Sequence, residues 1–271
     1  MKKRAICAAL CLTLCIALGG QAAAAERGVS FILNGAVLET EIAAQVIDQT
    51  VYVSYWPIVQ ALYPDAAAVW ANHRAEVTTE GLALYIKPGA KYIEANGRYL
   101  YVPDGVKSDG CNILVPVRVL CKALGAGVTW DSAACAIRIT SGSGPIVSGD
   151  EYYQADVVYW LSRIINAESG NQPLSGKIAV GNVVMNRVAS PRFPNTVYEV
   201  IFQRNQFTPA ANGSINRTPN AESVIAAKLC LEGANTAGNA LYFVNPNVSP
   251  GSWAARNRPY VATIGAHAFY A

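Results

Sequence analysis

From about residue 153 onward, hydrophobic positions recur with the period of an α-helix. Apolar residues at 157, 161 and 164 are followed by Glu168, at steps of four, three and four residues. This spacing places Glu168 on the apolar face of one helix, which Ser169-Gly170 ends. The sequence therefore predicts a helix whose buried stripe terminates in a carboxylate.

Further helices are predicted over 174–188, 196–202 and 218–232. Asn171 or Gln172 is the expected cap of the first of these, with Pro173 near its first turn. Thr196 and Glu199 are spaced as a capping box, and Gly233 follows the last helix. Segments 240–245 and 260–269 are rich in β-formers and predict a small sheet. The C-terminal half is thus expected to be a mainly helical α+β domain with a small sheet.

The N-terminal half contains an internal repeat. Residues 51–62 correspond to residues 113–124, and each copy is a short strand that runs into a helix. Residues 70–78 correspond to 130–140, each with a tryptophan-bearing strand, a polar turn and a second, alternating strand. Two such units are too few for a solenoid, so we expect them to pack on one another as one α+β module.

This half resembles the stalk module named after the N-terminal domain of copper amine oxidases. The matching residues lie at 34–35, 115–118, 124–126 and 128–131. The resemblance implies a spacing, binding or presentation role. Nothing in the sequence supports copper, because the single histidine of the module, His73, lies in a polar turn. We assign residues 26–141 to the stalk domain, the Ser/Gly-rich 142–150 region to a flexible linker, and 151–271 to a second domain.

The first residues are typical of a signal peptide. A basic start, Met1-Lys2-Lys3-Arg4, precedes an apolar run over 5–18 and small residues over 19–25. We expect removal of residues 1–25 and export, and no transmembrane anchor in what remains. Without these residues the chain holds 18 basic and 18 acidic side chains, with 9 and 11 of them in 26–149. This near-neutral balance argues against a nucleic-acid binder.

The cysteines do not form a metal-binding pattern. Cys7, Cys11 and Cys15 fall in the predicted signal peptide and follow no lipobox. The spacings of the others match no zinc motif, and no histidine lies near them, so we predict neither a metal nor a cofactor. Cys121 and Cys135 are interpreted as core residues, of a helix and of a strand respectively, although export permits a disulfide. The remaining two are Cys111 and Cys230.

Glu168 is the main candidate for chemistry. Burial disfavours its charged form, and the negative end of the helix dipole acts in the same direction, so its pKa is expected to be raised. A raised pKa suits a general acid at neutral pH. The pattern leaves two alternatives open: an ion pair with Arg163 or Arg187, or a frayed helix end in solvent.

The C-terminal half resembles the spore-cortex-lytic, SleB-type, cell wall hydrolases along 153–271. The matching segments are 164–170, 176–188, 193–196, 206–208, 240–246 and 264–270. The resemblance implies a lysozyme-like domain, similar to muramidases and lytic transglycosylases, in which Glu168 is the catalytic glutamate.

The supply of carboxylates favours one reaction type. The other acidic residues from 156 onward are Asp156, Glu199, Glu222 and Glu232; each of the glutamates has a structural explanation, and Asp156 is about 18 Å back along the same helix. A site with one carboxylate fits a lytic transglycosylase that cleaves the MurNAc–GlcNAc bond. The alternatives are a muramidase-type hydrolase and a non-catalytic peptidoglycan-binding protein. A zinc or cysteine peptidase or amidase is disfavoured, because this domain lacks the histidines that such enzymes need.

Aromatic and amide side chains are the candidates for sugar binding, although Phe207 and Phe243 also suit a core and His267 suits a structural role. Asn182 shares its helix with Asn186 and Arg187, which either line the cleft or end the helix. The expected partner is the peptidoglycan glycan strand, with envelope or spore proteins as candidate partners of the stalk, in a secreted protein of the cell envelope or spore cortex. The substrate-binding candidates are Gln206, Phe207, Tyr242, Phe243, Asn245 and Asn182.

Overall fold

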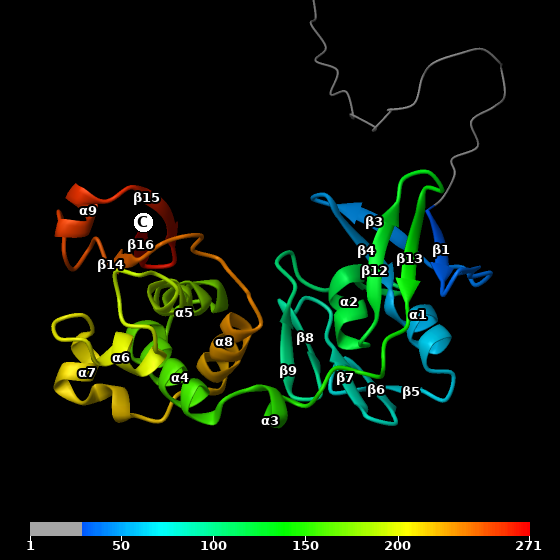
Figure 1. Ribbon diagram of the computed structural model, residues 1–271, viewed down its shortest axis with the longest axis horizontal. Coiled ribbons are helices and arrows are strands. Elements are labelled where there is room, and N and C mark those ends of the chain that lie inside the picture. The colour runs from blue at the N-terminus through cyan, green and yellow to red at the C-terminus, as the bar shows by residue number, and fades with distance from the viewer. Residues whose placement is uncertain (1–28) are drawn as a thin grey trace, which may run out of the picture.

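The computed structural model describes residues 29–271, so the predicted signal peptide and its cysteines lie outside the described residues. The chain forms two α+β domains that lie side by side (Figure 1). The N-terminal domain is rich in sheet, and the C-terminal domain is mainly helical with one small sheet. This is the predicted fold class. No helix within 29–271 has the length and apolarity needed to cross a membrane.

Three sheets build the N-terminal domain, with strand orders β12-β13-β1-β2, β10-β11-β4-β3 and β5-β6-β7-β8-β9. Their hydrophobic faces meet in one core with the two helices. The elements are β1 (Ser30–Leu33), β2 (Ala36–Val37), β3 (Ala44–Ile47), β4 (Thr50–Ser54), α1 (Tyr55–Leu62), β5 (Ala67–Ala71), β6 (Arg74–Thr79), β7 (Leu82–Ile86), β8 (Tyr92–Ala95), β9 (Arg98–Tyr101), β10 (Lys107–Ser108), β11 (Ile113–Pro116), α2 (Val117–Ala123), β12 (Gly127–Asp131) and β13 (Ala136–Thr140).

The internal repeat is confirmed. Strand β4 runs into α1 and strand β11 runs into α2, and the two strands pair antiparallel with Val53 opposite Val115. The tryptophan-bearing strands β5 and β12 form hairpins with β6 and β13. The two copies therefore pack through their first strands into a single domain, as the pattern predicts.

The two cysteines interpreted as core residues differ in position. Cys121 is fully buried on α2. Cys135 is exposed and has a φ of 48°, because β13 begins only at Ala136 and Cys135 belongs to the preceding turn. The placement of Cys135 on the inner face of a strand was wrong. All four cysteines of the described residues are free thiols.

The C-terminal domain packs three long helices together and adds a three-stranded antiparallel sheet of order β14-β16-β15. The helices predicted over 174–188 and 196–202 are confirmed. Its elements are α3 (Gly149–Tyr152), α4 (Ala155–Ser169), α5 (Leu174–Val188), α6 (Val197–Phe202), α7 (Thr208–Asn212), the 3-10 helix η1 (Ser214–Asn216), α8 (Ala221–Leu231), β14 (Tyr242–Val244), α9 (Trp253–Asn257), β15 (Tyr260–Ile264) and β16 (His267–Tyr270).

Two helix starts differ from the prediction. The residue before α5 is Pro173, without a side-chain cap, and the Oε1 of Gln172 instead accepts a hydrogen bond from the Ala266 N–H at 2.8 Å. That bond ties the start of α5 to the β15–β16 turn. Helix α8 begins at Ala221 and not at 218, because the Asn220 side chain accepts from the Ser223 N–H and caps the helix there. By contrast, Thr196 caps α6 as predicted: its Oγ1 accepts from the Glu199 N–H at 3.2 Å and donates to the Glu199 carboxylate at 2.8 Å.

Helix α5 approaches its neighbours closely at Gly181. A Cβ at this position would lie 2.6 Å from the Cys230 Sγ on α8 and 2.9 Å from the Ile165 Cδ1 on α4. Only glycine allows the helices this separation, since the cavity-free packing of a core leaves no room for an added methyl. This packing fixes the ends of α4 and α5 relative to each other.

A buried ion pair joins the two domains. Glu232, at the end of α8, accepts hydrogen bonds from Arg98 on β9 through Nε and Nη2, at 2.6 and 2.9 Å, and these side chains are 2% and 6% exposed. Lys122 and Tyr153 contact the same carboxylate at 2.8 and 3.0 Å. Burial alone would raise the pKa of Glu232, but the hydrogen bonds from Arg98 and Lys122 outweigh it and hold the pKa below its usual value.

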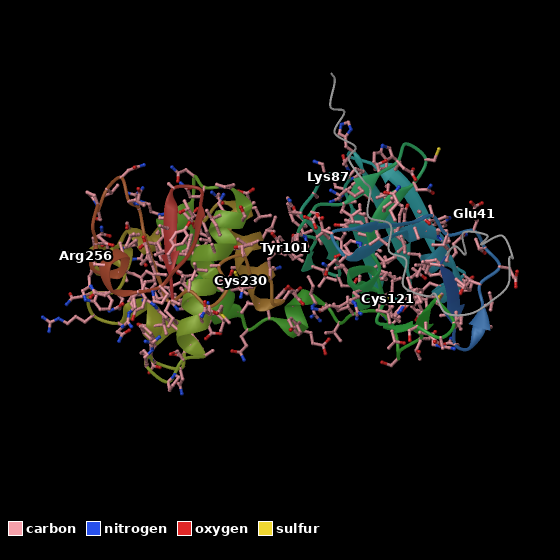
Figure 2. The ribbon with its side chains drawn as sticks, turned by 90° about the horizontal axis from the view of Figure 1, so that it is seen from above. Glu41, Lys87, Tyr101, Cys121, Cys230 and Arg256 are labelled. Atoms are coloured by element: carbon pink, nitrogen blue, oxygen red, sulfur yellow. The ribbon has the colours of Figure 1, made fainter. Side chains whose placement is uncertain are left out.

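The region predicted as a linker is held against the N-terminal domain at several points. Ile146 packs on the core of that domain, and its carbonyl accepts a hydrogen bond from the Asn96 side chain at 2.8 Å. The Gly149 N–H donates to the Asn96 carbonyl at 2.7 Å. Tyr101, which also packs against the C-terminal core, lies at the junction of the domains (Figure 2).

Candidate active site

A cleft of about 500 Å³ opens in the C-terminal domain. Its walls come from the ends of α4 and α5, the start of α7, strands β14 and β16, and the segment that leads into α9. In Figure 1, β14 and α9 lie on the side of this domain that faces away from the N-terminal domain. Segments far apart in sequence thus meet at one place.

Glu168 enters the cleft from the end of α4. Leu161, Ile164 and Ile165, on the preceding turns, are fully buried. Glu168 lies on the same face of the helix and is therefore partly buried. This burial raises the pKa of Glu168 to about 7. A carboxyl group with this pKa is present in both protonation states at neutral pH, as an acid that later acts as a base requires.

The ion pairs considered from sequence are not formed. The Arg163 guanidinium lies 3.7 Å from the ring centroid of Tyr159, and the Arg187 Nε donates to the Leu241 carbonyl at 2.8 Å. No ion pair within residues 29–271 includes Glu168. Its raised pKa is consistent with this lack of a cationic partner, since a paired carboxylate would be shifted the other way.

Among the residues that the structure describes, Glu168 is the one carboxylate that lines the cleft. Glu199 bonds Thr196, Glu222 pairs with Lys177, and Glu232 lies in the ion pair between the domains. Asp156 is exposed in the first turn of α4. The positions expected for the three glutamates are confirmed, because Glu199 follows its Thr196 cap, Glu222 lies in the first turn of α8 and Glu232 ends that helix.

Arg187 provides a cation at the wall of the cleft. It is 5% exposed, and its guanidinium carbon lies 4.9 to 5.6 Å from the ring centroids of Phe193, Phe207 and Tyr242. Burial lowers its pKa to about 10, so it remains charged at neutral pH. Of the roles considered for Arg187 from sequence, the one in which it lines the cleft agrees with the structure. The three rings around it come from three separate segments.

Five of the six predicted sugar-binding residues line the cleft. Phe207 is largely buried and packs towards Phe243, which in turn contacts the core residue Phe269. These two rings therefore belong to the core and to the cleft wall at once. Tyr242 is partly buried and meets the Trp253 ring at 5.7 Å. Gln206 and Asn245 complete the group.

The structure does not bring Asn182 to the cleft. It is 4% exposed, its Nδ2 donates to the Ala234 carbonyl at 2.7 Å, and its Oδ1 accepts from the Thr236 N–H at 2.9 Å. Asn186 likewise donates to the Gly238 and Ala240 carbonyls. Both amides are used in holding the loop that leads into β14, so the proposed binding role of Asn182 is corrected to a structural one.

Trp253 and His267 are cleft residues that the sequence did not single out for binding. Trp253 is 53% exposed at the start of α9. The sequence signal that could have identified it is an aromatic residue within a segment rich in Ser, Pro and Gly. His267 is buried, its Nδ1 has no hydrogen-bond partner within the described residues, and burial lowers its pKa from the usual value. Residues 29–271 contain no cluster of three or more potential metal ligands.

Two family models match the chain. Residues 171–270 match the model described as cell wall hydrolase, and residues 32–139 match the copper amine oxidase N-terminal domain. Glu168 lies just before the first of these matched segments.

Similar proteins include the spore cortex-lytic enzymes of Bacillus cereus, Oceanobacillus iheyensis and Bacillus subtilis. The first is 38% identical over 117 residues, which are 43% of this chain and 45% of that protein. The second is 33% identical over 129 residues, 48% and 46% of the two chains, and the third 35% over 109 residues, 40% and 35%. The chain therefore spans slightly less than half the length of the first two of these relatives.

Two solved structures are also similar. The catalytic domain of the germination-specific lytic transglycosylase SleB from Bacillus anthracis is 37% identical, with 44% of this chain and 97% of that chain covered and a TM-score of 0.41. The catalytic domain of the Bacillus cereus SleB protein gives the same identity and TM-score, with 92% of that chain covered.

Proposed function

We propose that this chain, in which a copper amine oxidase N-terminal-like domain precedes a domain of the cell wall hydrolase family, cleaves the glycan strands of peptidoglycan with Glu168 as acid and base. The observation that carries the proposal is the cleft itself. It holds one carboxylate, with a pKa raised to about 7 by burial, among aromatic and amide side chains.

The proposed reaction uses Glu168 twice. The protonated carboxyl group gives its proton to the oxygen that bridges N-acetylmuramic acid and N-acetylglucosamine, and the bond from that oxygen to the muramyl C1 breaks. The resulting carboxylate then takes the proton of the muramyl C6 hydroxyl as O6 bonds to C1. The products are a free N-acetylglucosamine end and a 1,6-anhydromuramyl end, and Glu168 is protonated again.

The lack of a second carboxylate in the cleft favours this route over hydrolysis. Glycoside hydrolysis ordinarily needs a partner carboxyl group, about 5 to 5.5 Å away as a nucleophile or about 6.5 to 9.5 Å away to activate water. In the intramolecular route the substrate's own hydroxyl replaces that water, so a single acid/base residue suffices. One of the two similar catalytic-domain structures is named a lytic transglycosylase, which agrees with the intramolecular route.

The other cleft residues suit an N-acetylated sugar. Tyr242 and Trp253 present aromatic surface that can cover the C–H faces of a pyranose ring. Gln206 and Asn245 carry side-chain amides that can pair with acetamido groups. The relatives are named spore cortex-lytic enzymes, so we propose spore cortex as the substrate, in a protein exported by its N-terminal segment to the cell envelope.

Product analysis tests this function. The full chain, its Glu168→Gln variant and a matched Glu199→Gln control would be incubated with purified spore cortex and with vegetative walls. The expected result is 1,6-anhydromuramyl products from the native chain and the control, and none from Glu168→Gln. Reducing muramyl ends alone would replace the proposal by a muramidase-type hydrolase. Sedimentation of the native chain with walls that it never solubilises would replace it by a non-catalytic binder.

A further inference from the structure

A second cavity lies in the N-terminal domain, away from the catalytic cleft. It encloses about 270 Å³ between the start of β4, helix α2 and strand β12. Its lining includes the apolar side chains of Val51, Val117 and Ile137, together with Trp130 and Arg118. None of its lining residues is shared with the cleft that holds Glu168.

Trp130 is unusually open for a tryptophan that borders a cavity. It is 50% exposed on β12, the edge strand of its sheet, where it lies opposite Ile137. The polar residues Thr129 and Gln49 line the same cavity. An exposed indole in such surroundings can lay its flat apolar face against a ligand.

Arg118 connects this cavity to another one. It is exposed in the first turn of α2 and also lines a cavity of about 440 Å³ at the junction of the two domains, together with Tyr101, Lys122 and Asn235. Lys122, one turn further along α2, is paired with Glu232, whereas Arg118 takes part in no ion pair within residues 29–271. Arg118 is the one lining residue that the two cavities share, and we call the surface that they form together the groove.

The charge at this point is local. Residues 26–149 contain 9 basic and 11 acidic side chains, so the domain as a whole does not attract anions. The guanidinium of Arg118 lies between the exposed indole of Trp130 and the ring of Tyr101. Aromatic rings can cover sugar rings and a guanidinium can bind a carboxylate, so this set of groups suits a ligand that carries both.

We propose that the groove from Trp130 across Arg118 to Tyr101 binds peptidoglycan, with a sugar ring on Trp130 and a stem-peptide carboxylate on Arg118. The choice of ligand rests on the proposed function of the catalytic domain. The ion pair of Arg98 and Glu232 holds the two domains together, so a strand bound here would keep the catalytic cleft close to the wall.

Sedimentation with purified peptidoglycan sacculi tests the proposal. Every protein would carry Glu168→Gln, so that binding is measured without cleavage. We expect Trp130→Ala and Arg118→Gln each to weaken binding about tenfold, since a lost aromatic contact or charge-assisted hydrogen bond is worth about 1.4 kcal/mol. Sacculi stripped of stem peptides by an amidase should lose the dependence on Arg118 and keep the dependence on Trp130.

The internal repeat supplies matched controls. Trp70 occupies the corresponding position of the first copy, is 60% exposed on the edge strand β5, and lies outside the groove. Lys87, on the outside of the same domain in Figure 2, controls for the loss of one charge. Trp70→Ala and Lys87→Gln should bind as the parent does, and thermal unfolding midpoints would establish that all variants fold.

Equal binding by all folded variants would overturn the proposal, as would an equal loss for Trp70→Ala and Trp130→Ala. The result is separable from the proposed catalytic function, because chains with Glu168 intact report cleavage in an independent assay. Trp70→Ala and Lys87→Gln in that background should release products from soluble glycan fragments at the native rate, whereas failure of every chain to cleave would refute the catalytic proposal alone.

Discussion

Replacing Glu168 by glutamine should stabilise the C-terminal domain at high pH and abolish its activity. Burial raises the pKa of this carboxyl group from 4.5 to about 7. A shift of this size corresponds to about 3 kcal/mol of unfavourable burial of the charge. Glutamine has nearly the same shape and never ionises, so the variant escapes this cost.

The sign of the effect follows from linkage. At about pH 4 and below, the group is largely protonated in the folded and the unfolded chain, and its ionisation contributes little. Between about 4.5 and 7 only the unfolded chain releases the proton, so the native protein loses stability as pH rises. Above about pH 7 the folded chain carries the buried charge, and the full cost of about 3 kcal/mol is present.

Urea unfolding at about pH 4 and about pH 8 measures this. The stability difference between Glu168→Gln and the native chain should be larger at pH 8 by about 3 kcal/mol, with unchanged denaturant slopes. Taking the difference between the two pH values cancels any cost of burying the amide itself. The exposed Glu199, replaced in the same way, is the matched control for the removal of one carboxylate. A pH-independent difference for Glu168→Gln would refute the desolvation of this carboxylate.

Four further outcomes are expected. The kcat on soluble glycan should fall as pH rises through about 7, because the acid form of Glu168 is then lost; a flat profile would exclude its role as acid. Glu232→Ala should cost about 3 kcal/mol in chemical unfolding by leaving Arg98 buried without its partner, and a neutral effect would mean that the ion pair is solvated. Gly181→Ala should lower stability by about 2 kcal/mol, seen in the same assay, because its methyl would overlap the Cys230 Sγ; unchanged stability would contradict the close helix contact. In the native protein a thiol reagent should modify the two exposed cysteines of the described chain and spare the two buried ones, whose pKa burial raises to about 12; reaction of all four would contradict the burial. The exposed pair is Cys111 and Cys135, and the buried pair is Cys121 and Cys230.

Local rules explain how much of the fold was predictable. The apolar stripe that ends at Glu168, the cap at Thr196 and the repeated strand–helix units all depend on spacing within a few residues, and each is present in the structure. Cys135 was misplaced because alternation with Ile137 and Ile139 continues by chance into a turn.

Contacts between distant segments account for what the sequence could not give. The burial of Arg187 among three rings depends on how α5 meets α6, α7 and β14, and no spacing along the chain encodes it. Asn182 was expected to line the cleft as an amide on the second helix of this domain, yet its face of α5 turns towards the loop at 234–236. The ion pair of Glu232 with Arg98 joins residues 134 positions apart.

The origin of the oxygen in the products tests the central claim most directly. Digestion of peptidoglycan in water enriched in oxygen-18 distinguishes a site in which Glu168 works alone from one that activates water. If O6 of the substrate closes on C1, the muramyl ends formed during the reaction should be 1,6-anhydro sugars without the heavy isotope. Heavy oxygen at C1 of the new muramyl ends would show that water attacks, and would contradict the single-carboxylate mechanism.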